Sequence, residues 1–136
     1  MFVSETQLRV RYAETDKMGY VYYGKYAEYY EIGRTDSIRK FGMTYRRMED
    51  EGIILPVLSF SCKYIRPAYY DDLLTVRTMI KEKPETRLKF EYEIINEQGE
   101  LINVGETVLV FVDAATRRPR KAPDDFLQQL NQYFDK

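Results

Sequence analysis

The residues best suited to chemistry lie between Tyr12 and Arg34 (YAETDKMGYVYYGKYAEYYEIGR), where a polar turn containing Asp16 leads into a helical pattern. Aromatic and small side chains then recur at intervals of three or four residues, which predicts a helix over about residues 22–41. The members of this stripe are Tyr22, Tyr26, Tyr30, Gly33, Ser37 and Phe41. A helix N-terminus offers unpaired N–H groups and a partial positive charge. A carboxylate beside it would combine a nucleophile or base with a stabiliser of negative charge.

Three carboxylates in this stretch have competing interpretations. Asp16 could attack or deprotonate a substrate, or it could only cap a turn or helix, as Asp commonly does. Glu14, two residues earlier, is a rival, but we expect it to be a solvated loop residue. Glu31 lies in mid-helix among Tyr and Ile, where a buried carboxylate must find partners. We therefore expect Glu31 to join a hydrogen-bond network at a subunit contact.

The absence of histidine excludes several kinds of catalysis. With no histidine among 136 residues, Ser-His-Asp and Cys-His nucleophiles, histidine-ligated zinc and imidazole bases are impossible. No GxGxxG motif, P-loop or DxDxDG-type calcium loop occurs either. An enzyme with this sequence must use carboxylate, tyrosine, lysine or backbone groups. We expect no metal and no cofactor.

Length, charge and cysteine content indicate one globular domain over residues 1–136. The formal net charge of -1 gives no reason to expect a nucleic-acid partner. The longest apolar run, Val108 to Val112, is too short to span a membrane, and the N-terminus lacks the features of a secretory signal. A single cysteine, Cys62, allows no internal disulfide and fits a reducing compartment, so we expect a cytoplasmic protein.

The remaining pattern is mostly strand. Alternation predicts a first strand before the helix and four strands after it, with a short helix from Thr44 to Glu51 between them and a last helix over Asp124 to Phe134. The residues expected to share the inner faces are Thr6, Leu8, Val10 and Tyr12; Leu58, Phe60, Cys62 and Tyr64; Leu74, Val76, Thr78 and Ile80; and Leu88, Phe90, Tyr92 and Ile94. Short connections favour an antiparallel meander of the second to fifth strands.

This order predicts an α+β fold in which a curved sheet covers one long helix. Such a sheet leaves open edges, and pairing them across a two-fold axis protects them, so we expect a homo-oligomer. Cys62 falls on an apolar strand face and is expected to be a buried structural thiol. The tyrosines are expected to be mostly core, with Tyr23 the best candidate for lining a pocket.

One long motif resembles a known family. The run Arg11-Tyr12-x-Glu14-Thr15-Asp16-x-Met18-Gly19-x-Val21-Tyr22-x-x-x-Tyr26-x-x-Tyr29-x-Glu31-x-x-Arg34 is similar to the hotdog-fold acyl-CoA thioesterases. Within them it resembles the 4-hydroxybenzoyl-CoA thioesterase type and its Tol–Pal-associated relatives. The similarity continues through residues 59–67 (SFSCKYIRP), 70–74 (YDDLL) and 111–113, followed by Arg118-Pro119, and covers nearly the whole chain.

The resemblance implies a five-stranded antiparallel sheet wrapped around a long central helix, dimers that often pair into tetramers, and thioester hydrolysis. The family's catalytic aspartate falls on Asp16, and its carbonyl-polarising backbone N–H falls on Tyr23, with Gly24 beside it. Many relatives have a histidine where this chain has Tyr23 and an asparagine where it has Lys25, so roles of those side chains do not transfer.

The substrate implied is an acyl-CoA or an acyl-carrier-protein thioester. Its phosphates need clustered cations, and the dense basic patch of residues 117–121 could supply them or could be a solvated loop. The candidate substrate-binding residues are Arg117, Arg118, Arg120 and Lys121 in that patch, Arg87 and Lys89 on an open strand face, and Tyr23. A dehydratase of the same fold would need a histidine, whereas a non-catalytic acyl-thioester sensor or scaffold stays open as an alternative.

Overall fold

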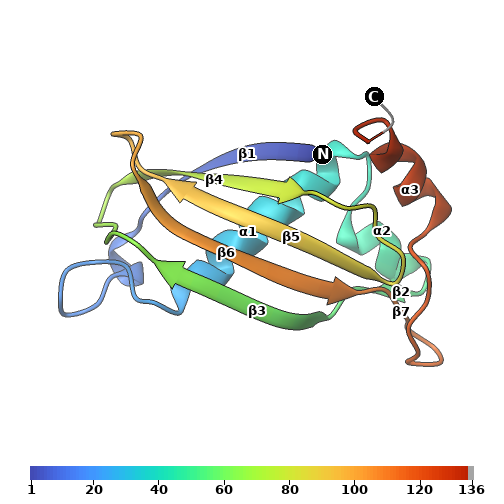
Figure 1. The fold of residues 1–136 in the computed structure, drawn as a ribbon. Coiled ribbons are helices and arrows are strands. Elements are labelled where there is room, and N and C mark those ends of the chain that lie inside the picture. The colour runs from blue at the N-terminus through green and yellow to red at the C-terminus, as the bar shows by residue number, and fades with distance from the viewer. Residues whose placement is uncertain (135–136) are drawn as a thin grey trace.

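The computed structural model describes residues 1–134. It contains a sheet of long strands, one long helix and two shorter helices (Figure 1). The elements are β1 (Phe2–Arg9), a 3₁₀ turn (Tyr12–Glu14), α1 (Lys25–Lys40), α2 (Tyr45–Asp50), β2 (Ile53–Ile54), β3 (Val57–Tyr64), β4 (Leu73–Ile80), β5 (Arg87–Ile95), β6 (Leu101–Val110), β7 (Val112–Asp113) and α3 (Asp124–Asn131).

The main sheet has five antiparallel strands in the order β1-β4-β5-β6-β3, and it curves across α1 (Figure 1). This confirms the α+β hotdog architecture expected from the sequence. The expected meander of four strands was wrong in one respect, because only β4, β5 and β6 follow one another in the sheet. β3 pairs with β6 instead of with β4, and this places β3 at the far edge.

Helix α1 buries one face against the sheet and packs mainly on β1 and β4. Tyr30 lies parallel to Tyr92 of β5, with ring centroids 4.2 Å apart. At Gly33 a Cβ would lie 2.8 Å from Val76 Cγ1, so only glycine lets α1 approach β4 this closely. The predicted stripe is thus buried from Tyr26 onward, but Tyr22 is exposed and precedes the helix.

In two strands, residues that the sequence pattern placed on an inner face are exposed in the structure. Tyr12 does not belong to β1, which ends at Arg9, and its side chain is 76% exposed. In β3, Leu58, Phe60 and Tyr64 are about half-exposed, because α1 lies toward β1 and β4 and no further strand covers this edge.

Cys62 of β3 was expected to be buried, but it is only half-buried. The side-chain amide of Asn103 donates a hydrogen bond to its sulfur at 3.1 Å. The short pair β2–β7 was not expected from the sequence, and α3 ends at Asn131, earlier than the predicted Phe134. No helix within residues 1–134 is long and apolar enough to cross a membrane.

Candidate active site

Asp16 lies in a tight loop that closes on itself. Thr15 and Val21 form an antiparallel bridge, and the Asp16 N–H donates to the Tyr20 carbonyl at 2.9 Å. Gly19, with φ of +87°, allows the turn and donates its N–H to the Asp16 carbonyl at 3.0 Å. The loop therefore fixes the backbone of Asp16 at both ends.

One oxygen of the Asp16 carboxylate accepts a hydrogen bond, and the other is open. Its Oδ1 accepts a hydrogen bond from the Met18 N–H at 2.9 Å. Within residues 1–134 its Oδ2 has no hydrogen-bond partner, and the side chain is half-buried. An oriented oxygen of this kind is free to act on a substrate or a water.

The residues that lead into α1 carry the next candidate groups, because Tyr23 lines the same cavity as Asp16. The helix begins at Lys25, three residues later than predicted, and Gly24 is its N-cap. Within the described residues, neither the Tyr23 nor the Gly24 N–H donates a hydrogen bond outside the helix, so both remain available to a ligand. The Tyr64 hydroxyl donates to the Tyr23 carbonyl at 3.1 Å and holds this turn in place.

A cavity of about 450 Å³ opens beside Asp16, and four tyrosines are among the residues that line it. It is lined by Asp16, Met18, Tyr20, Val21, Tyr23, Tyr26, Tyr64, Ile65, Arg66 and Pro67. Burial raises the pKa of Tyr26 to about 12, and burial with nearby Cys62 raises the pKa of Tyr64 to about 12, so both phenols are neutral donors at neutral pH. The cavity therefore combines one carboxylate with apolar rings and neutral hydroxyls.

A second hollow of about 560 Å³ also contains Asp16 but is more polar. Its lining includes Tyr12, Lys17, Tyr22 and Lys25. Asp16 is shared by the two cavities, so a substrate could place an apolar part on one side of the carboxylate and a polar part on the other.

Glu14 is not the solvated loop residue that the sequence suggested. Its side chain is 6% exposed, and it accepts hydrogen bonds from the Tyr29 hydroxyl and from Arg11. Burial alone would raise the pKa of Glu14, but the hydrogen bonds from the Arg11 backbone and side chain and from Tyr29 outweigh it and hold that pKa below its usual range. Glu31, expected to join a hydrogen-bond network at a subunit contact, is exposed on α1 of the single chain, and that contact stays a prediction.

The basic residues predicted to bind phosphates lie at the opposite end of the sheet from Asp16 (Figure 1). Arg117, Arg118 and Arg120 belong to the turn after β7, where Asp113 Oδ1 accepts N–H groups of residues 115 and 116. Arg87 is close to the same end, since it pairs with Val110 at the end of β6. One chain alone therefore does not bring these cations to Asp16.

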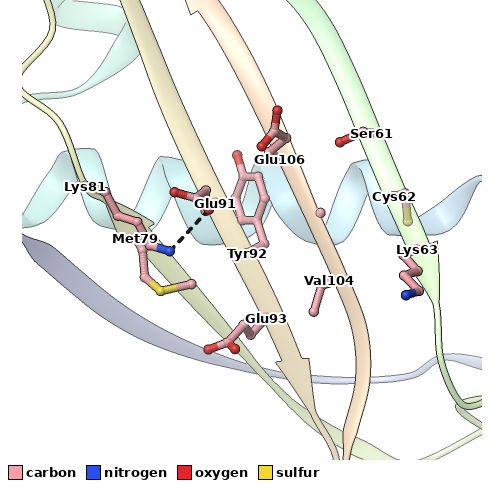
Figure 2. A pocket seen from close by; sticks show the side chains of 11 residues that line it. Ser61, Cys62, Lys63, Met79, Lys81, Glu91, Tyr92, Glu93, Val104 and Glu106 are labelled. Atoms are coloured by element: carbon pink, nitrogen blue, oxygen red, sulfur yellow. Dashed lines mark hydrogen bonds and ion pairs between the residues drawn. The ribbon is translucent and has the colours of Figure 1, made fainter.

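Lys89, the remaining cation candidate, lies on the outer face of the sheet. It pairs with Glu106 at 3.5 Å. Figure 2 shows this face, where Lys63 and Lys81 lie on either side of three glutamates. The depression there has a volume of about 360 Å³, and Lys81 donates a hydrogen bond to Glu91 at 3.3 Å. Ion pairs engage Lys89 and Lys81 on this face, and a role for Lys89 in binding phosphates stays a prediction.

Three cavity residues escaped the sequence prediction of a site. Tyr20, Tyr64 and Arg66 come from the Asp16 loop and from the end of β3. Tyr64 was assigned to an apolar strand face, and Arg66 only to the end of that strand. No local pattern in the sequence indicates that the end of β3 meets the Asp16 loop.

The comparisons with known proteins agree with this fold. The profile of the thioesterase-like superfamily matches residues 10–130. The acyl-CoA thioester hydrolase YbgC of Escherichia coli O157:H7 is 31% identical over 125 residues, 92% of this chain and 93% of that protein. YneP of Bacillus subtilis is 36% identical over 129 residues, 93% of this chain and 94% of its own.

Solved structures of related proteins superpose closely on this chain. The DHNA-CoA thioesterase from Staphylococcus aureus superposes with a TM-score of 0.93 at 36% identity, covering 99% of this chain and 93% of that one. The protein TT1821 from Thermus thermophilus superposes with a TM-score of 0.88 at 33% identity, covering 95% and 98%. The fold and the site thus define a hotdog protein with a carboxylate at a helix entry. The chain belongs to the thioesterase-like superfamily.

Proposed function

We propose that this protein hydrolyses acyl-CoA thioesters, with Asp16 as the reacting carboxylate. The observation that carries the proposal is that Asp16, with an open carboxylate oxygen, lines the same cavity as Tyr23, whose N–H is unpaired within the described residues. Thioester hydrolysis needs a nucleophile or base on one side of the carbonyl and hydrogen-bond donors for the oxyanion on the other. The Tyr23 N–H, with that of Gly24 beside it, would supply those donors.

Two routes use the same residues. In one, an Asp16 oxygen attacks the thioester carbon, the thiolate leaves, and water then hydrolyses the mixed anhydride. In the other, Asp16 takes a proton from a water that attacks directly. In both, the N-terminal end of α1 favours the negative charge that develops on the carbonyl oxygen.

The lining of the 450 Å³ cavity supports an aromatic acyl group. Rings of Tyr20, Tyr23, Tyr26 and Tyr64 surround it, and offset or edge-on ring contacts favour a planar aromatic guest. The neutral hydroxyls of Tyr26 and Tyr64 could bond its substituents. The similarity to a DHNA-CoA thioesterase supports a bicyclic hydroxyaryl group as the first candidate.

We further propose that two copies pair through the open edge of β3. That strand exposes Leu58, Phe60 and Tyr64, and no other strand within residues 1–134 pairs with its outer side. Antiparallel pairing across a two-fold axis reverses the strand, so the basic end of the second copy would lie beside the Asp16 cavity of the first. Arg117, Arg118 and Arg120 of the second copy could then meet the phosphates of CoA.

The proposal also concerns the domain organisation and the cellular location of the enzyme. We propose that residues 1–136 act as one hotdog domain in the cytoplasm, where a single unpaired cysteine fits the reducing conditions. A carrier-protein thioester presents the same phosphopantetheine arm as CoA and is an alternative substrate. We expect the dimers to pair further into tetramers.

The test is thiol release from short-chain, long-chain and aromatic acyl-CoAs, with DHNA-CoA in the aromatic group and an acyl-carrier-protein in a parallel assay. Asp16→Asn should lower kcat by about 10²-fold or more, as expected when a reacting carboxylate is lost. Asp125→Asn, an exposed change on α3, is the control and should leave kcat unchanged. Full turnover by Asp16→Asn would refute the assignment of Asp16.

Two further measurements separate the remaining possibilities. A single turnover in H₂¹⁸O with excess enzyme places ¹⁸O in Asp16 only if that carboxylate attacks and water then opens the anhydride at the Asp16 carbon. Direct attack by water labels the released acid and leaves Asp16 unlabelled. Acyl-CoA binding without turnover in the wild-type protein would instead favour the non-catalytic sensor.

The dimer has its own test, which is the mass in solution by light scattering. Phe60→Lys places a charge on the β3 edge and should yield monomers, whereas Val3→Lys on the opposite edge strand should not. Unchanged mass for Phe60→Lys would place the subunit contact elsewhere.

A further inference from the structure

Glu14 is the one buried acidic side chain among residues 1–134, and the chemistry proposed above does not use it. Four hydrogen bonds reach its carboxylate. Oε1 accepts the Tyr29 hydroxyl at 2.9 Å and the Arg11 N–H at 2.9 Å. Oε2 accepts the Arg11 Nε at 3.2 Å and Nη2 at 3.0 Å. A buried carboxylate is stable only when it is satisfied in this way.

These contacts join Glu14 to Arg11, three residues earlier, and to α1, fifteen residues later. Arg11 follows β1, Glu14 ends the 3₁₀ turn before the Asp16 loop, and Tyr29 lies in α1. Tyr29 is 1% exposed, so its hydroxyl has a fixed position in the core. The side chain of Glu14 therefore anchors the beginning of the Asp16 loop to the helix.

The backbone of Glu14 holds the end of the same loop. Its carbonyl accepts the Tyr22 N–H at 2.9 Å, and the next residue, Thr15, bridges Val21. Asp16 is thus two residues from Glu14 itself, and Tyr23 is one residue from Tyr22, whose N–H donates to the Glu14 carbonyl.

We infer that Glu14 and Tyr29 are a positioning pair that sets the distance between the Asp16 carboxylate and the Tyr23 N–H. This inference rests on the proposed hydrolysis. The pair does not touch the substrate, and it acts by fixing the loop on α1. Displacement of reacting groups by about 1 Å can cost about 10²-fold in rate, so such anchoring matters for chemistry and not only for folding.

Tyr29→Phe tests the pair with the least disturbance, because it removes one hydroxyl and keeps the ring. Tyr92→Phe is the matched control: Tyr92 is equally buried and its hydroxyl bonds Thr107 at 2.6 Å, on β5 and β6 and away from the loop. We expect both variants to lose similar thermal stability. Only Tyr29→Phe should lower kcat, by about five- to ten-fold with KM changed less than about two-fold, since a bond to a charged group is lost.

Glu14→Gln gives a second perturbation of the same pair. It keeps the size of the side chain but loses the charge, and it should lower kcat by at least as much as Tyr29→Phe. The double variant should be no slower than Glu14→Gln alone, because the two changes remove one shared interaction. An additive loss in the double variant would overturn the inference, as would a Tyr29→Phe variant that loses stability but keeps its kcat.

Hydrogen exchange of the backbone amides distinguishes a wrong positioning inference from a wrong proposal of hydrolysis. Peptides covering residues 15–25 should exchange faster in Tyr29→Phe than in the wild type, and Tyr92→Phe should leave them unchanged. A wild-type protein inactive on every thioester would end the hydrolysis proposal. Unchanged exchange in Tyr29→Phe would end the positioning inference whatever the activity.

Discussion

Gly105→Ala is the substitution for which the structure predicts the largest effect from a single added methyl group. Gly105 lies in β6, opposite Cys62 of β3 and Tyr92 of β5. A Cβ at this position would lie 2.6 Å from the ring of Tyr30 and 2.6 Å from the Ser61 carbonyl, and it would also overlap the Tyr30 hydroxyl. Both neighbours must move, one in the core and one in the backbone of the edge strand.

The expected cost has two parts. Overpacking in a filled core costs about 1–3 kcal/mol, and disturbing the hydrogen bond from the Tyr30 hydroxyl to Asn103 adds about 1 kcal/mol. We therefore expect Gly105→Ala to lower the free energy of unfolding by about 2–4 kcal/mol and Tm by about 10 °C. Urea unfolding at one fixed protein concentration measures this, with an unchanged m-value expected.

The Tyr30→Phe background provides the internal check. Without the hydroxyl, one of the two overlaps with Tyr30 is relieved, so the added methyl should cost about 1 kcal/mol less than in the wild type. A loss below about 0.5 kcal/mol for Gly105→Ala would refute the packing argument. An equal cost in both backgrounds would refute the role of the hydroxyl.

Four further predictions concern the site and the core. Tyr64→Phe, which removes the hydroxyl on the Tyr23 carbonyl, should lower kcat about two- to ten-fold, whereas Tyr70→Phe on the exposed surface should not change it. The rate should be nearly constant from about pH 6 to 8, because the chain has no histidine to titrate there; a steep change in that range would contradict the assignment. The lowered pKa of Glu14 means that its stabilisation is present above about pH 4.5 and is lost as the pH falls through the folded-state pKa, so Glu14→Gln should unfold in acid with a shallower pH dependence than the wild type. Phe126→Ala, which removes a fully buried ring between Phe41 and Phe111, should cost about 3–5 kcal/mol in urea unfolding, and a loss below about 1 kcal/mol would contradict this.

The sequence predicted most of the regular structure because alternation and helical spacing are local. The inner faces of β4 and β5, expected at Leu74 to Ile80 and Leu88 to Ile94, are buried as predicted. Tyr22 was placed on the helix because its spacing from Tyr26 fits a helix, yet the chain becomes helical only at Lys25. Spacing alone cannot locate a helix start within a turn.

The order of the strands and the burial of Glu14 were not predictable in the same way. Alternation in β3 indicates which residues share a face, but not that β3 lies at an edge without cover from α1. Glu14 is buried by Tyr29, a residue 15 positions later, and such a contact exists only after the chain has folded. Asp16 was identified because several residue types coincide around it, and the structure places it beside the cavity.

The open edge of β3 also bears on how copies of this chain would recognise each other in the dimer proposed above. Backbone N–H and C=O groups along an edge present nearly the same pattern in every protein, so they cannot distinguish this chain from another of the same fold. Discrimination must come from the side chains along the edge, chiefly Leu58, Phe60 and Tyr64, and from the register shift between Val57 and Ser59. A change at these few positions could therefore alter which chains assemble together while leaving the Asp16 loop untouched.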